Sequence, residues 1–147
     1  MLKKKRVIFY FALIFILLSI FAFLLTKIDF CKKEIFASTE IERINYLESF
    51  GWEVERGSSE KMEITIPLNF NKTYEDYNKI QLSQGFDLIE YAGKKVECFI
   101  YNITNYPNYS DDIRANLLIY DGKIIGGNIY SIFRPGFSHK LSKNIQK

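Results

Sequence analysis

Few residues in this sequence have the types and spacing needed for catalysis. The chain has one histidine, His139, and two cysteines, so it supports neither a histidine-rich metal site nor a cysteine–histidine nucleophile pair. Asp111 and Asp112 lack the spaced oxygen ligands and the turning glycine of a calcium loop. Gly126-Gly127 has neither the lysine nor the helix of a phosphate-binding loop. We therefore expect no catalytic residue, no bound metal and no cofactor.

Aromatic side chains are the better candidates for binding. The segment Tyr106-Pro107-Asn108-Tyr109 carries two tyrosines outside any predicted helix or strand, and Trp52 is the single tryptophan. Such rings stack on sugars or on peptides, but tyrosines also pack over the edge of a sheet with their hydroxyl groups in water. We take Trp52, Tyr106 and Tyr109 as the candidate binding surface, with the packing role as the alternative.

An uncharged run near the N-terminus decides where these residues are displayed. The run is VIFYFALIFILLSIFAFLL, from Val7 to Leu25, and as a helix it would span roughly 28 Å, close to the ~30 Å hydrocarbon core of a membrane. Four cations precede it, Lys3, Lys4, Lys5 and Arg6. By the positive-inside rule, we expect residues 1–6 in the cytoplasm, a transmembrane helix over 7–25, a juxtamembrane linker over 26–37 and an extracytoplasmic domain over 38–147.

A cleaved secretory signal is the alternative to this anchor. Signals have an apolar run of only ~7 to 15 residues that is closely followed by a small-residue cleavage site. The one suitable site here, Ile35-Phe36-Ala37 before Ser38, comes well after Leu25, and lysines lie between them. We therefore expect a retained single-pass anchor in the cell membrane.

The charge of the outer segment excludes one class of partner. The chain has a net charge of +3, and without the four cations at positions 3–6 the remainder carries −1. A nucleic-acid-binding domain would need a basic patch, so we expect no nucleic-acid partner. A hydrophobic content of 48% and an aromatic content of 16% indicate that the outer segment folds.

Two helices are predicted in the outer segment. Ser38-Thr39 and Glu42 form a capping box that begins a helix over Glu40 to Phe50. A second helix runs from Tyr74 to Gln84, and its cap is one of two residues, Asn71 or Thr73. Three amides of this helix are expected at its surface or as partners of loop backbone: Asn78, Gln81 and Gln84.

The remaining patterns predict strands. Alternation or apolar runs indicate five of them: Trp52–Glu55, Met62–Ile66, Val96–Ile103, Ala115–Tyr120 and Lys123–Phe133. Asp121-Gly122 is a two-residue hairpin turn, and Gly126-Gly127 indicates a bulge or a close approach of backbone. The predicted fold is α+β, an N-terminal transmembrane helix followed by a small domain with two helices packed on an antiparallel sheet of four or five strands.

The two cysteines would lie on the oxidising side of the membrane in this topology. A disulfide between Cys31 and Cys98 would require the linker to run back along the sheet, because the bond restricts the Cα separation. The alternative is a buried Cys98 and a free Cys31.

Several stretches of the sequence together resemble one family. They are FGWEVE from Phe50, TIPLNF from Thr65, YNKIQLSQGFDLIEYAGKKV from Tyr77, NYP from Asn105, NLLIYDGKIIGG from Asn116 and GFSH from Gly136. In this order they resemble the bacterial family known as domain of unknown function 4830. The resemblance implies a small domain behind an N-terminal membrane segment in Gram-positive bacteria, and it implies no activity. In that family the position after the double glycine is often acidic, whereas this chain has Asn128.

These observations together predict a single-pass membrane protein whose outer domain binds a protein or a cell-envelope component without catalysis. Two other functions stay open. An envelope hydrolase would use a pair of Asp or Glu carboxylates, since paired carboxylates need no histidine. A carbohydrate-binding module would hold a cell-wall glycan with Trp52, Tyr106 and Tyr109.

Overall fold

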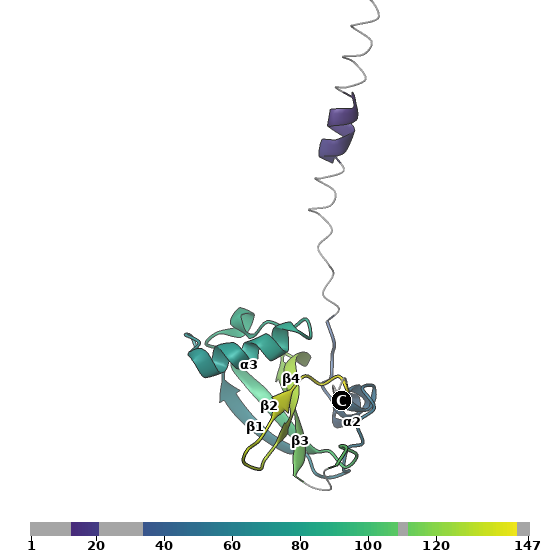
Figure 1. Cartoon of the computed structure of the whole chain (residues 1–147), viewed down its shortest axis with the longest axis vertical. Coiled ribbons are helices and arrows are strands. Elements are labelled where there is room, and N and C mark those ends of the chain that lie inside the picture. The colour runs from purple at the N-terminus through teal and green to yellow at the C-terminus, as the bar shows by residue number, and fades with distance from the viewer. Residues whose placement is uncertain (1–12, 21–33, 109–111, 144–147) are drawn as a thin grey trace, which may run out of the picture. The chain divides into compact units, whose positions relative to one another are not determined.

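The computed structural model describes residues 13–20, 34–108 and 112–143 (Figure 1). The chain divides into two compact units, Met1–Lys33 and Glu34–Lys147. The predicted membrane segment, residues 7–25, lies only partly within the described ranges, and its described part, residues 13–20, is helical. Within those ranges, no helix combines the length and the apolar character needed to cross a membrane. Cys31 and residues 26–33 of the predicted linker lie outside the described residues.

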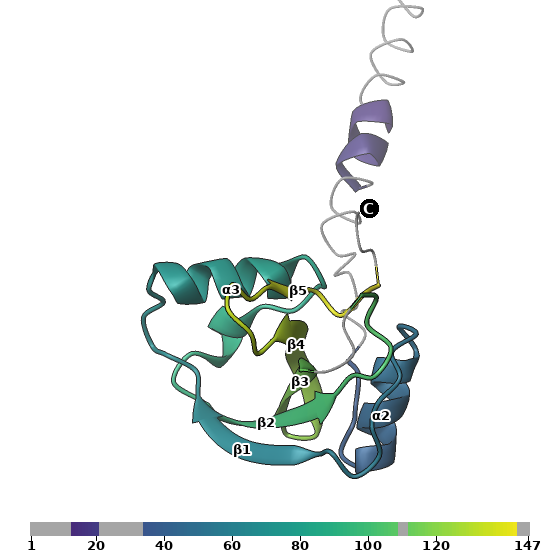
Figure 2. The ribbon, with the colours of Figure 1, turned by 60° about the horizontal axis from the view of Figure 1, so that its bottom comes forward.

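A five-stranded antiparallel sheet forms the centre of the second unit (Figure 2). Its strands follow one another across the sheet in chain order: β1 Glu60–Thr65, β2 Lys95–Asn102, β3 Ile113–Tyr120, β4 Lys123–Ser131 and β5 Ser138–His139. Asp121 and Gly122 have φ angles of 49° and 73°, as a two-residue hairpin turn requires. The predicted β3–β4 hairpin is therefore confirmed.

Two details of the predicted strands are wrong. Trp52–Glu55 was expected as a strand, but it contributes one isolated bridge, Val54 to Ile103. The alternation of apolar and polar residues in this segment reflects the burial of Trp52 and Val54. It does not mean that the segment pairs with a neighbouring strand along its whole length. The last strand was expected to continue to Phe133, whereas β4 ends at Ser131 and the chain returns as the two-residue β5.

The helices begin at the predicted capping residues. Helix α2, Glu40–Glu48, has a complete capping box between Thr39 and Glu42, and helix α3, Lys72–Leu82, is capped by Asn71. A 3₁₀ helix, η1 (Leu88–Tyr91), follows α3. A side chain that accepts from a free N–H of the first turn is a local interaction, which is why the sequence predicts these starts well.

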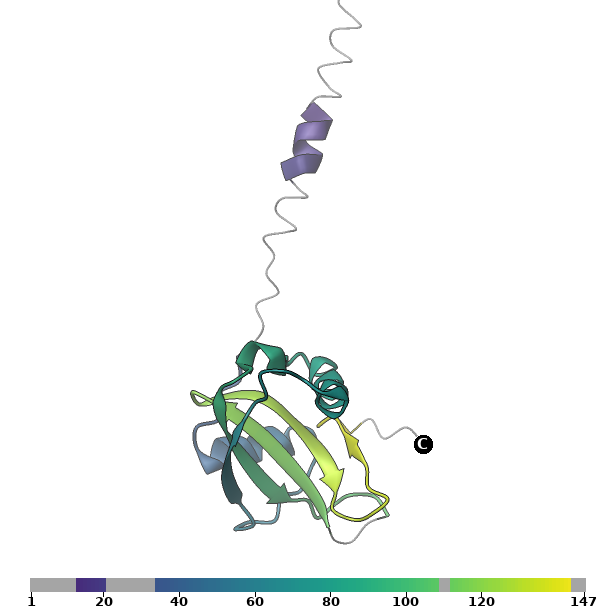
Figure 3. The same cartoon turned by 90° about the vertical axis from the view of Figure 1, so that its left-hand side faces the viewer.

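Helices lie on both faces of the sheet (Figure 3). Along β3, Leu117 and Ile119 belong to the apolar cluster that includes Leu47 of α2. Leu118 belongs to a second cluster, against which Tyr77 of α3 packs. This alternation follows from the two-residue period of a strand, so each face has its own core. The α+β fold with helices packed on a five-stranded antiparallel sheet is thus confirmed.

Buried amides hold α3 against β4. Gln81 is fully buried, and its Oε1 accepts from the backbone N–H of Gly127 at 2.8 Å. Asn78 Oδ1 accepts from the N–H of Leu88 at 2.9 Å. A Cβ atom on Gly126 would lie 3.0 Å from Gln81 Oε1, so the absence of a side chain there allows the close approach. Of the two predicted roles, surface group or partner of loop backbone, Asn78 and Gln81 have a role close to the second, because they bond to the backbone of Leu88 and of Gly127 in β4.

The hairpin contains the predicted bulge. Leu118 pairs with Gly126 and Ile119 pairs with Ile124, so Ile125 is the extra residue on β4. A bulge changes which face the following residues occupy. After it, the register places Asn128 directly opposite Asn116.

The folded unit begins before the expected boundary at Ser38. Ile35 O accepts from the N–H of Ile124 at 2.8 Å, and the N–H of Ala37 donates to Gly122 O at 2.8 Å. Ala37 is fully buried in the core that α2 covers. Residues 34–37, which the sequence places in the linker, are therefore part of the domain.

Candidate functional site

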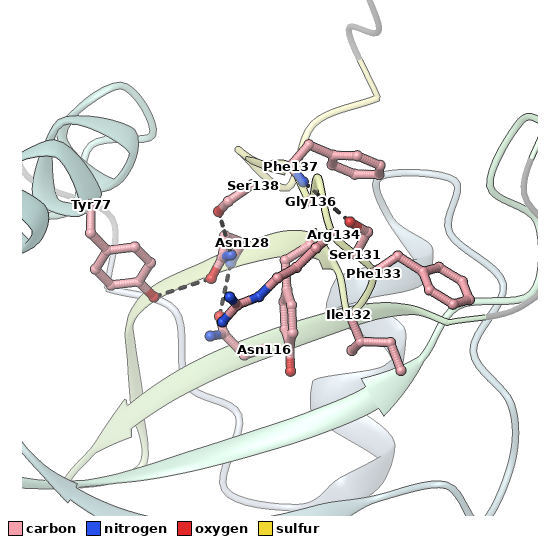
Figure 4. Close-up of a pocket in the computed structure, with 11 residues that line it drawn as sticks. Tyr77, Asn116, Asn128, Ser131, Ile132, Phe133, Arg134, Gly136, Phe137 and Ser138 are labelled. Atoms are coloured by element: carbon pink, nitrogen blue, oxygen red, sulfur yellow. Dashed lines mark hydrogen bonds between the residues drawn. The ribbon is translucent and has the colours of Figure 1, made fainter.

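A cavity of about 540 Å³, shallow and largely open to solvent, lies beside α3 (Figure 4). Tyr77 comes from α3, Asn116 comes from β3, and Asn128 and Tyr130 come from β4. The remaining lining residues belong to the segment that we call the loop 131–138, which includes the last residue of β4 and the first residue of β5. This volume lies within the range of ~300–1,000 Å³ that is usual for small-molecule sites. We call Asn116 and Asn128 the floor of the cavity.

The floor is a hydrogen-bonded network across two strands. Asn116 Oδ1 accepts from the backbone N–H of Asn128 at 3.0 Å. The side chain of Asn128 is 3% exposed; its Oδ1 accepts from the Tyr77 hydroxyl at 3.1 Å and its Nδ2 donates to Ser138 Oγ at 2.7 Å. A buried amide with both ends paired holds one orientation. The floor is therefore preorganised.

Tyr77 adds no charge to this network. Burial raises the pKa of its hydroxyl well above the ordinary range, and the hydrogen bond with Asn116 opposes that shift in part. The hydroxyl consequently keeps its proton at physiological pH and donates it to Asn128 Oδ1. The floor is polar and uncharged.

The loop 131–138 forms the wall of the cavity. Ser131 closes the loop on itself, because its backbone N–H donates to Phe137 O and its Oγ accepts from the N–H of Phe137, both at 3.1 Å. Arg134 is exposed and lines the cavity, and it makes no ion pair with the residues that the structure describes. Ile132 and Phe133 are 47% and 56% exposed. The wall thus brings one cation and two exposed apolar side chains to the cavity.

Two of the three predicted binding residues lie together, but not as an open surface. The rings of Trp52 and Tyr106 stack with their centroids 5.6 Å apart and an interplanar angle of 1°. Trp52 is 1% exposed, and its Nε1 donates to Leu141 O at 2.6 Å. Trp52 is therefore a core residue with no face left for a ligand. Tyr109 lies outside the described residues.

Tyr106 and His139 connect this aromatic stack to the cavity wall. Tyr106 also stacks on Phe137, with centroids 5.1 Å apart, and its hydroxyl is hydrogen-bonded to His139 Nε2 at 3.0 Å. His139 Nδ1 lies 2.7 Å from Lys140 O. Because a carbonyl oxygen can only accept, Nδ1 carries a proton and donates it to Lys140 O. The single histidine orients the aromatic stack behind the loop.

Comparison with known proteins identifies a family. The family model described as "Domain of unknown function (DUF4830)" matches residues 46–129, more than half of the chain. The chain belongs to this family. The resemblance seen in the sequence is thereby confirmed. No curated protein and no solved structure matches the chain.

The DUF4830 match includes only part of the site. It contains Tyr77, Asn116 and Asn128, and it ends before the loop 131–138. Sequence patterns missed the cavity because Asn116 and Asn128 look like ordinary strand residues until the bulge at Ile125 sets their register. Asparagine is unfavourable in strands. The presence of one asparagine in each of two neighbouring strands was the feature of the sequence that could have indicated a site.

A second cavity in the DUF4830 domain is relevant to the hydrolase alternative. It measures about 240 Å³ and contains two carboxylates, Glu55 and Asp112, beside Arg114. Glu55 Oε2 accepts from Asn102 Nδ2 at 2.7 Å. Among the described residues, no group of three or more His, Cys, Asp or Glu side chains could hold a metal ion.

Proposed function

We propose that this protein is a membrane-anchored binding domain that holds a component of the cell envelope in the cavity above Asn116 and Asn128. The observation that carries the proposal is the preorganised polar floor beside an exposed cation. Polar groups placed in a fixed geometry inside a concave surface are what a ligand site requires.

The lining residues favour binding over catalysis. The two lining serines, Ser131 and Ser138, accept hydrogen bonds from Phe137 N and Asn128 Nδ2. A serine nucleophile needs an adjacent group that takes its proton. Among the described residues that line this cavity, there is no histidine, lysine or carboxylate. The arrangement therefore has donors and a cation for recognition, and lacks the base for acyl transfer.

The anchor is part of the same proposal. The charge-free run over 7–25 and the cations at positions 3–6 would keep the N-terminus in the cytoplasm and the domain outside. In cells stripped of their wall, a protease added outside should digest the domain while an N-terminal tag stays intact. If the tag is digested and the domain is protected, the protein has the opposite orientation in the membrane.

Nuclear magnetic resonance tests the binding function. The full-length ¹⁵N-labelled protein in lipid nanodiscs would be titrated with soluble fragments of digested cell wall. The side-chain amide signals of Asn116 and Asn128 should shift, and Asn116→Ala should remove the shifts of the other residues around the cavity. Asn45→Ala is the control, because Asn45 is an exposed asparagine of α2 that lines neither this cavity nor the second one.

The same titration separates the alternatives. If the fragments are cleaved during the titration and Glu55→Gln abolishes the cleavage, the protein is a hydrolase that acts at the second cavity, and the binding proposal is wrong. Binding that survives Asn116→Ala and is lost in Tyr109→Ala would favour the carbohydrate-binding module.

A further inference from the structure

We propose that the ligand of this cavity carries a free carboxylate beside an apolar group, as the C-terminal end of a short peptide does, and that Arg134 binds the carboxylate. This inference rests on the proposed function, and it adds the chemical class of the ligand.

The first argument is the balance of donors and acceptors in the floor. Asn116 Oδ1 and Asn128 Oδ1 already accept from Asn128 N and Tyr77. Ser138 Oγ accepts from Asn128 Nδ2, so the proton of its own hydroxyl is left to donate. An amide nitrogen carries two hydrogens, and Asn128 Nδ2 uses one of them for Ser138. The floor therefore has two donors to offer, the Ser138 hydroxyl and the second hydrogen of Asn128 Nδ2. These donors suit a ligand that carries acceptors.

The second argument is charge. Among the described residues, Arg134 is the one charged residue that lines the cavity, and it has no ion-pair partner among the described side chains. A guanidinium forms two parallel hydrogen bonds with a carboxylate. One guanidinium balances one negative charge. A dianionic phosphate would leave a second charge uncompensated beside apolar side chains, so a carboxylate fits better.

The third argument is the apolar rim beside that cation. Ile132 and Phe133 precede Arg134 and keep 47% and 56% of their surface exposed, and Figure 4 shows them on the loop that carries Arg134. Apolar surface that borders a polar pocket is typical of ligand sites. The volume of about 540 Å³ leaves room for more than a carboxylate. An apolar side chain next to the carboxylate would cover this rim.

A pair of matched probes tests the inference. N-acetyl-alanyl-phenylalanine and its C-terminal amide differ only in charge at one end, and both can be titrated into the full-length protein in nanodiscs. We expect the acid to bind about tenfold more tightly than the amide, as expected for a hydrogen-bonded charge pair. Arg134→Gln should abolish that difference without unfolding the domain, because Arg134 is exposed. Arg56→Gln, at an exposed arginine outside the cavity, should leave the difference unchanged.

Each outcome decides one of the two proposals. Equal affinity for acid and amide, with shifts at Asn116 and Asn128, overturns the carboxylate inference and leaves the binding function standing. Phenyl phosphate that binds more tightly than the acid also overturns it. If neither the probes nor the cell-wall fragments shift the floor signals, the proposed function itself fails.

Discussion

Arg43 is a buried charge whose contacts join three parts of the domain. It is 6% exposed; its Nε donates to the Tyr101 hydroxyl at 2.9 Å, and its Nη1 donates to Ala37 O and Ser38 O. Its guanidinium also lies 3.7 Å from the centroid of the Phe99 ring. Arg43→Leu removes this donor from the Tyr101 hydroxyl and from Ala37 O, both of which belong to fully buried residues. We expect a loss of about 2–4 kcal/mol in the free energy of unfolding.

Urea denaturation of a fragment containing residues 34–147 measures this loss. Arg56→Leu is the matched control, because the Arg56 side chain is 65% exposed and pairs with Glu48 at 3.0 Å. Exposed ion pairs contribute about 0–1 kcal/mol. If Arg43→Leu costs no more than Arg56→Leu, the buried hydrogen bonds do not stabilise the domain as proposed.

Cys98 is a buried thiol that should resist alkylation. Burial raises its pKa to about 11, and a raised thiol pKa disfavours the reactive thiolate at every pH below it. In a Cys31→Ser variant at pH 8, the folded protein should react with iodoacetamide roughly 100-fold or more slowly than the same protein in urea. The folded rate should rise as the pH approaches 11. Mass spectrometry follows the reaction, and equal rates in the two states would contradict burial of the thiol.

At the scale of the elements, the β3–β4 hairpin depends on one glycine more than on its neighbour. A Cβ atom on Gly127 would lie 2.7 Å from Asn116 O, which is backbone, whereas one on Gly126 would first meet the end of the Gln81 side chain at 3.0 Å. Backbone can only yield by moving β3 away from β4. Gly127→Ala should therefore cost about 1–3 kcal/mol and disturb the Asn116 signals.

Gly126→Ala provides the comparison for that experiment. We expect it to cost less, since a side chain gives way more easily than a strand. Thermal unfolding of the two variants measures the order of their stabilities. If Gly126→Ala is less stable than Gly127→Ala, the contact of β4 with α3 tolerates an added side chain less well than the pairing of β3 with β4 does.

The elements also show what a sequence can and cannot predict. Thr39 and the Asp121-Gly122 turn were found from the sequence, and Asn71 was one of two candidate caps, because each of these residues acts on backbone within a few positions of itself. The pairing of Asn116 with Asn128 depends on the bulge at Ile125, and no local pattern gives the register of a bulged strand. The cavity depends on that register and on the hydrogen bonds between Ser131 and Phe137 that close the loop 131–138. Neither feature can be predicted from a local pattern, so the sequence did not indicate the cavity.

The role of an aromatic residue is hard to predict from the sequence. Trp52 was taken as part of the candidate binding surface, with packing as the alternative, and the structure leaves it 1% exposed. An aromatic ring satisfies the same pattern whether it stacks on a sugar or on Tyr106. The neighbour of the ring decides between a binding role and a packing role. That neighbour, Tyr106, comes from a distant part of the chain.

At the scale of the whole molecule, the start of the folded unit can be measured. A fragment beginning at Ser38 loses the hydrogen bonds of Ile35 and Ala37 with the β4 hairpin and the acceptor that Ala37 O offers to Arg43. It also loses a fully buried side chain. We expect residues 38–147 to be about 2–4 kcal/mol less stable than residues 34–147, counting roughly 1 kcal/mol for each hydrogen bond.

Lys123→Ala in the longer fragment provides the control for this comparison. It removes the exposed ion pair with Glu34, whose atoms lie 2.7 Å apart, and leaves the backbone pairing intact. Because an exposed pair contributes at most about 1 kcal/mol, this variant should stay close to the parent in urea. If Lys123→Ala greatly lowers the free energy of unfolding, the ion pair, and not the backbone pairing, is the main contribution of the N-terminal segment to stability. Equal stability of the two fragments would instead place the boundary at Ser38, where the sequence pattern alone predicts it.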